Sequence, residues 1–289
     1  MKKIMGLFLA AAAAVCMTAC SSPAPRETEA PAAETEAPAA ETEAPAAETE
    51  APAAEKTDLM VAAAASLQYV MEDEIGPAFE KENPDISLTF TFDSSGKLQT
   101  QIEEGADADV FFSAAMKQMT ALQEENLVDA DSVTELLENK ITLIVPKGSE
   151  LGITGFEDIT KAEKIAIGDP ESVPAGQYAN EAFENLGMWD DVLAKASLGT
   201  NVTEVLSWVA EGSADAGVVY LTDATTSDQA DRIEIIGYAP EGSCKKVIYP
   251  VGIVSASQKK DAAAKFIEYL RTEEGSAAFE KYGFTPIAQ

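Results

Sequence analysis

The sequence lacks histidine altogether and has only three cysteines among its 289 residues. Without histidine the chain has no imidazole to act as the general base of a serine or cysteine hydrolase, and it also lacks a G-x-S-x-G nucleophile motif. The same two shortages argue against a zinc or haem site. We therefore expect no enzymatic activity, no cofactor and no metal cation held directly by side chains. A serine hydrolase that uses Ser66 or Ser95 with Lys97 is the remaining enzymatic alternative.

Basic residues are scarce as well, with 20 Lys and Arg against 50 Asp and Glu, and the formal net charge is -30. Nine of the acidic and four of the basic residues precede Thr57, so the rest of the chain keeps a net charge near -25. Such a charge opposes binding to nucleic acid and adhesion to anionic lipid surfaces. We therefore expect no nucleic-acid partner.

Long apolar runs are also missing, except for one that follows Lys2 and Lys3 and is too short to span a bilayer. This pattern is typical of a secretory signal peptide, here residues 1–20. It ends in MTAC, which resembles the lipobox of bacterial lipoproteins, in which the cysteine is acylated. We expect Cys20 to carry lipid and to anchor the mature protein outside the cytoplasm, on the cell membrane. An ordinary signal peptide beside an unmodified cysteine is the alternative.

Residues 21–57 are expected to form a disordered tether. The segment ETEAPAA occurs four times in succession between Glu27 and Ala54, and it contains no large apolar side chain that could be buried. The proline in each repeat also excludes a coiled coil. Once Cys16 is removed with the signal and Cys20 is acylated, Cys244 is the one remaining thiol, so no intrachain disulfide can form.

Strand and helix patterns alternate from residue 58 onward. Strand-like segments such as DLMVAA, KIAIGDP and AKASLG precede helices expected over residues 67–83, 175–186 and 202–210, and one helical tail is expected over 259–282. This alternation predicts an α/β fold with helices on both faces of mostly parallel sheets. In such folds, ligands bind where strands end and helices begin.

Four of these strand-to-helix turns share one chemistry. Ser66, the pair Ser94 and Ser95, Ala175 and Val202 stand at expected helix starts, with small or hydroxyl side chains around them. Each start offers free backbone N–H groups and the positive end of a helix dipole. One such turn would indicate only helix capping, because serine and asparagine are common N-caps. Four of them predict a site for an anion.

Five segments resemble, in order and spacing, the molybdate-binding proteins that deliver their substrate to ABC importers; these segments are AAAASL, SSGKLQTQIEEGADADVFFSA, GDPESVPAGQYANEAFENLGMWD, NVTEVLSWVAEGSADAGVVYLTDA and KKVIYPVGIV. The resemblance extends from Asp58 to the C-terminus. It implies the two-lobed periplasmic-binding-protein fold of type II, with a two-stranded hinge. Lobe 1 would contain residues 58–139 and 247–289, and lobe 2 residues 140–246. A monomer and an ABC transporter permease as its partner are also implied.

The resemblance places the molybdate donors on five residues, namely Ser66, Ser95, Ala175, Val202 and Tyr220. The two serines would donate through hydroxyl and backbone N–H, Ala175 and Val202 through backbone N–H, and Tyr220 through its phenol. One departure is Gly96, where the family often has a third serine or another polar residue. By its strand position alone Tyr220 would be a core residue. Asp169 and Asp223 lie near these turns and are expected to have capping or turn roles.

Neutral donors also suit the proposed ligand chemically. A buried dianion needs every oxygen hydrogen-bonded, and a donor set without acceptors disfavours protonated anions such as hydrogen phosphate. Tungstate has the same shape and charge as molybdate, so the sequence predicts binding of both. The same fold with sulfate or a small organic acid as its ligand is the alternative within the binding class.

Overall fold

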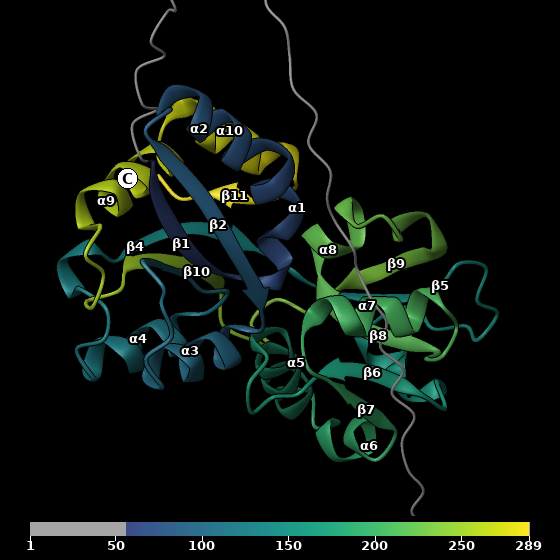
Figure 1. Ribbon diagram of the computed structural model, residues 1–289. Helices are drawn as coiled ribbons and strands as arrows, with labels where there is room; N and C mark the ends of the chain where they lie inside the picture. The colour runs from purple at the N-terminus through teal and green to yellow at the C-terminus, as the bar shows by residue number, and fades with distance from the viewer. Residues whose placement is uncertain (1–55, 289) are drawn as a thin grey trace, which may run out of the picture. The chain divides into compact units, whose positions relative to one another are not determined.

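The computed structural model describes residues 56–288. The expected signal peptide, Cys20 and nearly all of the expected tether lie outside the described residues. Two β-sheets flanked by helices make up the described chain (Figure 1). Between residues 56 and 288, no helix combines the length and the hydropathy that crossing a membrane requires.

The first sheet has six strands in the order β11-β4-β10-β3-β1-β2. β1 pairs in parallel with β2 and β3, whereas β10 is antiparallel to both β3 and β4. In Figure 1, α2 and α10 cover one face of this sheet, and α3 and α4 cover the other. The strand bounds are β1 Thr57–Ala64, β2 Ile86–Asp93, β3 Val110–Phe112, β4 Thr134–Asn139, β10 Val247–Ile253 and β11 Thr285–Pro286.

The second sheet has five strands in the order β7-β6-β8-β5-β9. β6 pairs in parallel with β7 and β8, and β5 is antiparallel to β8 and β9. Helices α5 and α7 pack against β6 and β8. The strand bounds are β5 Ile141–Pro146, β6 Ile165–Gly168, β7 Ala196–Gly199, β8 Ala216–Tyr220 and β9 Ile233–Tyr238.

The helices follow the strands in chain order. The α-helices are α1 Gln68–Val70, α2 Gly76–Glu82, α3 Ser95–Glu103, α4 Met116–Glu124, α5 Pro174–Asn185, α6 Trp189–Leu193, α7 Val202–Ala210, α8 Leu221–Thr226, α9 Lys260–Leu270 and α10 Glu273–Lys281. The shorter helical turns are η1 Ala65–Leu67, η2 Met71–Ile75, η3 Ala130–Ser132, η4 Phe156–Lys161 and η5 Ala230–Arg232. The helix expected over residues 67–83 is therefore a run of four helical segments, and η2 within it is a π-helix.

We call the part built on the first sheet lobe 1 and the part built on the second sheet lobe 2. The chain passes from lobe 1 to lobe 2 between β4 and β5, where Lys140 separates the two strands. It returns through residues 239–246, between β9 and β10. Two short connections therefore join the lobes.

The expected α/β class is confirmed, but both sheets are mixed rather than mostly parallel. Of the nine strand pairs in the described residues, four are parallel and five are antiparallel. Parallel neighbours need a crossover, usually a helix, and this is how β1, β2 and β3 are joined, as are β6, β7 and β8. The four strands next to the lobe connections, β4, β5, β9 and β10, pair antiparallel with their neighbours.

The interior of each sheet explains why some strands have continuous apolar sequences. Every residue of β8 is buried, and so are the first five residues of β5. A strand that is covered on both faces loses the alternation of apolar and polar residues that a half-exposed strand shows.

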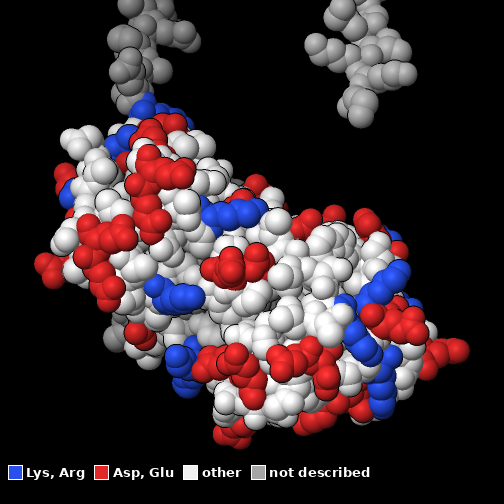
Figure 2. Space-filling view, turned by 90° about the horizontal axis from the view of Figure 1, so that it is seen from below, with Lys and Arg blue, Asp and Glu red and all other residues white. Residues whose placement is uncertain are grey.

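Outside the core, acidic side chains spread over the face shown in Figure 2, and basic ones lie singly or in small groups among them.

Candidate functional site

All five predicted donors line one small cavity between the lobes. Ser66 follows β1, and Ser95 follows β2, both in lobe 1. In lobe 2, Ala175 follows β6, Val202 follows β7, and Tyr220 ends β8. These five strands run parallel within their sheets, so their carboxyl ends bring the donors to one edge of each sheet. Each donor residue is more than nine-tenths buried.

Close backbone packing holds the first turn of α5 at this cavity. Pro174 is its first residue, where a missing N–H costs no helical hydrogen bond. A β-carbon built on Gly176 would lie only 1.9 Å from the carbonyl oxygen of Gly168, the last residue of β6. Only glycine allows this approach, which places the N–H of Ala175 beside the end of β6.

An N-terminal cap positions α7. The side chain of Asn201 accepts a hydrogen bond from the N–H of Glu204 at 2.9 Å, and the Glu204 carboxylate accepts one from the N–H of Thr200 at 2.7 Å. These two hydrogen bonds hold the first turn of the helix against the residues that precede it. It leaves Val202, the first helical residue, at the cavity wall with an N–H that has no acceptor inside the helix.

The two predicted serines are both held by other protein groups. The hydroxyl oxygen of Ser95 accepts a hydrogen bond from the N–H of Ala114 at 2.9 Å. The hydroxyl of Ser66 lies 2.8 Å from the phenol oxygen of Tyr249, a buried residue of β10. These contacts fix the two side chains at the cavity instead of leaving them free to rotate.

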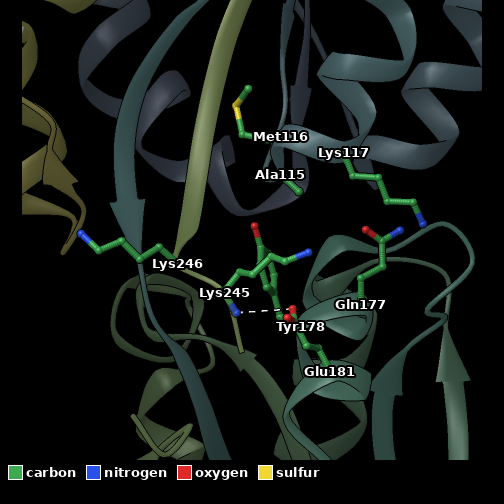
Figure 3. Close-up of a pocket in the computed structure, with 8 residues that line it drawn as sticks. All are labelled: Ala115, Met116, Lys117, Gln177, Tyr178, Glu181, Lys245 and Lys246. Atoms are coloured by element: carbon green, nitrogen blue, oxygen red, sulfur yellow. Dashed lines mark hydrogen bonds between the residues drawn. The ribbon is translucent and has the colours of Figure 1, made fainter. Parts of the chain in front are cut away.

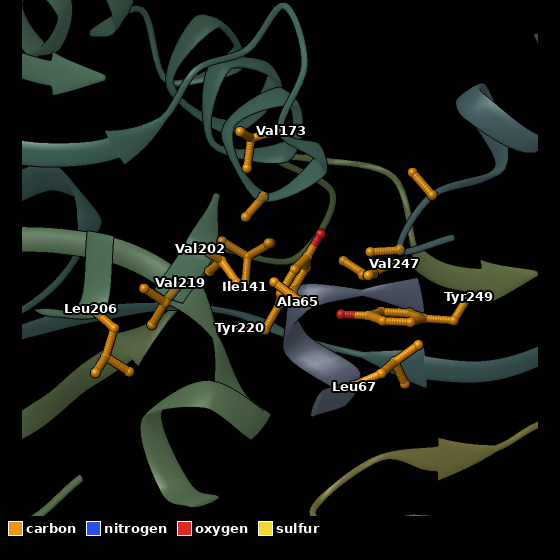
Figure 4. Close-up of a cluster of buried hydrophobic side chains, with 14 of the residues drawn as sticks. Ala65, Leu67, Ile141, Val173, Val202, Leu206, Val219, Tyr220, Val247 and Tyr249 are labelled. Atoms are coloured by element: carbon orange, nitrogen blue, oxygen red, sulfur yellow. The ribbon is translucent and has the colours of Figure 1, made fainter. Parts of the chain in front are cut away.

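Tyr220 presents a phenol that the protein leaves unpaired. Its ring packs edge-on against that of Tyr249, with centroids 5.6 Å apart (Figure 4). Its hydroxyl oxygen is buried and has no hydrogen-bond partner within the described residues. Burial raises the pKa of Tyr220 well above its usual value, so the phenol keeps its proton. A buried O–H without an acceptor is costly, and a bound anion would satisfy it.

Ser94 was not among the predicted donors, but the structure adds it to the cavity. It is the N-cap residue of α3, yet its side chain makes no capping bond, and its buried hydroxyl has no partner within residues 56–288. The sequence motif SSG offers two adjacent serines, and only the tertiary structure shows that both hydroxyls are buried beside the cavity.

The cavity has donors but almost no charge. Asp93 is the one charged residue among those that line it in the described chain, and its carboxylate forms an ion pair with Lys97 at 3.2 Å. The other lining residues are small, apolar or hydroxyl-bearing. The cavity volume is about 10 Å³, near the least that one water molecule requires, so a larger ligand needs the walls to separate.

Gly96 brings the two lobes into direct backbone contact at the cavity edge. Its N–H donates to the carbonyl oxygen of Ser172 in lobe 2 at 2.9 Å, and a β-carbon here would lie 2.3 Å from that oxygen. The departure from the serine-rich motif therefore permits a hydrogen bond between the lobes. A second link joins Gln118 to Gln177 at 3.2 Å.

A larger cavity of about 330 Å³ lies one turn further along α5 (Figure 3). Lobe 1 lines it with the start of α4, and lobe 2 with Gln177, Tyr178 and Glu181 of α5. Three lysines also line it, namely Lys117, Lys245 and Lys246. This cavity could not be predicted from the sequence, because its lysines come from segments far apart in the chain.

The two aspartates near the turns differ. Asp169 has the expected turn role, since its carboxylate accepts a hydrogen bond from the N–H of Glu171 at 2.9 Å. Asp223 is buried in the first turn of α8, and its Oδ2 has no partner within the described residues. Burial raises the pKa of Asp223 to about 7.

In residues 56–288, no group of three or more acidic or cysteine side chains is placed to hold a metal ion.

Comparisons with known proteins agree on one family. The profile of the family described as bacterial extracellular solute-binding protein matches residues 59–285. YvgL of Bacillus subtilis, provisionally named an ABC transporter substrate-binding lipoprotein, is 42% identical over 230 residues, which cover 80% of this chain and 87% of YvgL. The molybdate-binding protein ModA of Haemophilus influenzae is 36% identical over 233 residues, which cover 78% of this chain and 89% of ModA.

One solved structure adds a spatial comparison. It is a substrate-binding domain from Clostridium difficile, assigned provisionally to a molybdenum ABC transporter, and it has 38% sequence identity to this chain. The superposition has a TM-score of 0.62 and covers 81% of this chain and 100% of that domain. The similarity therefore includes both lobes and the cavity between them.

Proposed function

Because the chain belongs to the family of bacterial extracellular solute-binding proteins, we propose that it captures molybdate between its two lobes and delivers it to an ABC importer. The resemblance expected from the five sequence segments is confirmed by the family match and the relatives. The family binds solutes and is not a family of enzymes.

The observation that carries the proposal is a buried cavity whose polar groups are nearly all donors. Backbone N–H groups at three helix starts and the hydroxyls of Ser66, Ser95 and Tyr220 surround it. A tetrahedral dianion offers four acceptors and no proton, which matches such a set. Tungstate presents the same acceptors, so the proposal includes it. Molybdate is the cargo, and the proposal requires no cofactor.

The proposal extends to where the protein works. Acylation of Cys20 would hold it on the outer face of the cell membrane, and the repeat segment before Thr57 would let the folded part reach the permease. The provisional name of YvgL also contains the word lipoprotein. Donors from both lobes of one chain complete the cavity, so a monomer is sufficient.

Titration calorimetry of the purified protein with molybdate, tungstate, sulfate and phosphate tests the proposal directly. We expect tight binding of molybdate and tungstate and little response to the other two, because hydrogen phosphate would leave its O–H unpaired and sulfate is the smaller tetrahedron. Tight binding of sulfate alone would assign the fold to another anion. Absence of heat and of thermal stabilisation with all four would refute the proposal.

Removing single donors should weaken binding without unfolding the protein. Ser95→Ala and Tyr220→Phe should each cost about 1.5–3 kcal/mol in molybdate affinity, the usual contribution of a hydrogen bond to a charged group. Tyr238→Phe is the matched control, since Tyr238 is an exposed tyrosine at the end of β9. Calorimetry and thermal unfolding of all three variants give the comparison. Unchanged affinity in both donor variants would remove these residues from the site.

A further inference from the structure

A chain of buried hydrogen bonds extends from the lobe connection to Ser66. Asn139 is the last residue of β4, where the chain leaves lobe 1, and Tyr249 lies on β10, which follows the return. The side-chain nitrogen of Asn139 is 3.2 Å from the phenol oxygen of Tyr249. That oxygen is in turn 2.8 Å from the hydroxyl of Ser66 at the cavity. All three side chains are buried.

The surrounding groups determine which way the Asn139 amide points. The backbone N–H of Lys140 donates to the Oδ1 of Asn139 at 2.8 Å, and a backbone N–H can only donate. The amide NH₂ therefore faces the other two partners, the hydroxyl of Thr222 at 2.9 Å and the phenol of Tyr249 at 3.2 Å. An amide NH₂ can only donate as well, so the oxygen of Tyr249 is an acceptor.

The direction of the hydrogen bond between Asn139 and Tyr249 determines the direction of the next one, between Tyr249 and Ser66. Tyr249 stays protonated, because burial raises the pKa of its phenol well above the usual value. The Asn139 amide NH₂ cannot accept, so among the hydrogen-bond partners of Tyr249 in the described residues only Ser66 can accept from the phenol O–H. This assigns the donor role to Tyr249 and the acceptor role to the hydroxyl oxygen of Ser66, 2.8 Å away. The hydrogen of Ser66 is then left to point into the cavity that Ser66 lines. Ser95 is arranged in the same sense, because its oxygen accepts from the N–H of Ala114.

We propose that Tyr249 and Asn139 are positioning residues that orient the Ser66 hydroxyl as a donor toward the cavity and so favour oxyanions that carry no proton. The inference rests on the proposed function, since it concerns the selectivity of the same site. A protonated oxyanion needs at least one acceptor, and the oxygen of Ser66 is already engaged by Tyr249. The two residues thus act on ligand choice without touching the ligand.

The same chain links ligand selection to the connection between the lobes. Thr222 belongs to α8 of lobe 2, whereas Asn139 and Tyr249 belong to strands of lobe 1. The amide of Asn139 donates to both lobes at once. A change in the angle between the lobes would therefore disturb the group that orients Ser66.

A double-mutant cycle with Ser66→Ala and Tyr249→Phe tests the proposal. Tyr249→Phe keeps the ring and removes the O–H, and we expect molybdate affinity to fall roughly three- to tenfold, as for the loss of one neutral hydrogen bond. In the Ser66→Ala protein, the same substitution should change affinity by less than about twofold, because no hydroxyl remains to be oriented. An equal loss in both backgrounds would overturn the proposal.

Two further measurements separate positioning from a general loss of structure. Asn139→Ala removes the amide that donates to Tyr249. It should lower molybdate affinity when Ser66 is present and change it little in the Ser66→Ala protein. Competition with phosphate should show that Tyr249→Phe narrows the preference for molybdate over phosphate about threefold or more, since the Ser66 oxygen can then accept a hydrogen bond from the O–H of hydrogen phosphate. Tyr282→Phe, which removes a surface hydrogen bond to Asp73, should leave that preference unchanged. A preference that stays the same in Tyr249→Phe contradicts the proposal.

The outcomes also distinguish this inference from the proposed function. If the unmodified protein binds none of the oxyanions, the proposed function fails before any variant is compared. If it binds molybdate and the two substitutions are simply additive, the proposed function stands, and the assignment of Tyr249 and Asn139 is wrong.

Discussion

Gly176→Ala should lower molybdate affinity on the order of 100-fold or more and destabilise the protein at the same time. The added methyl group would lie 1.9 Å from the carbonyl oxygen of Gly168 and 2.5 Å from its carbon, so the start of α5 must move by about 1 Å or more. This movement withdraws the N–H of Ala175 and disturbs its neighbours, each donor being worth about 1.5–3 kcal/mol toward an anion.

The same clash between the added methyl group and Gly168 lowers the free energy of unfolding. Forcing an extra methyl into a packed interface costs about 1–3 kcal/mol, which corresponds to a drop of roughly 3–10 °C in the unfolding midpoint. Gly237→Ala is the matched control, because a β-carbon there would meet no atom within 4 Å. Calorimetry should show a lower molybdate affinity, and thermal unfolding a lower midpoint, in Gly176→Ala, whereas both quantities should change little in Gly237→Ala. Wild-type affinity and midpoint in Gly176→Ala would mean that the contact between α5 and β6 does not set the site.

Asp223→Asn should stabilise the protein at pH 8 by roughly 4 kcal/mol and have little effect near pH 4. Burial raises the pKa of Asp223 to about 7, against an ordinary value of 3.8. Between these two pH values, the folded chain holds a proton that the unfolded chain has released. The free energy of unfolding therefore falls as the pH rises from about 4 to about 7, and the loss is complete above 7.

Asparagine has nearly the same shape and does not titrate, so the variant should lack this component of the pH dependence. Denaturant unfolding at several pH values between 4 and 8 measures the difference between the two proteins. Asp131→Asn, which removes an exposed carboxylate, controls for the change in net charge. Parallel stability curves for wild type and Asp223→Asn across this range would show that Asp223 is not a buried acid with a raised pKa.

Helix bounds are predictable from the sequence where capping residues mark the ends of a helix. The helix expected over residues 202–210 is α7 with the same bounds, because Asn201 and Glu204 cap it within one turn. The expected tail over residues 259–282 is instead two helices, α9 and α10. They are divided at Thr272, whose hydroxyl caps α10 by accepting from the N–H of Gly275. The sequence carries this signal as a threonine followed by two glutamates, which is typical of a helix start.

β4 could not be found from its sequence. β4 has the sequence TELLEN, with strong helix formers and no alternation of apolar and polar residues. It is a strand because β10 and β11 pair with it from more than 100 residues further along the chain. Pairing partners so far away leave no trace in the local pattern, and they override weak propensity.

The sequence by itself determined the chemistry available to this protein. It has helix starts with small residues and free N–H groups, serines beside them, no histidine and few basic residues. These features are local, since each depends on a few consecutive residues and on backbone geometry. The tertiary structure decided which of them meet. It brought Ser66 to Tyr249 across 183 residues and Tyr249 to Asn139 across 110, and it buried Asp223 and the hydroxyl of Ser94. The direction of a hydrogen bond and the pKa of a buried acid depend on neighbours from other strands, so they are properties of the fold.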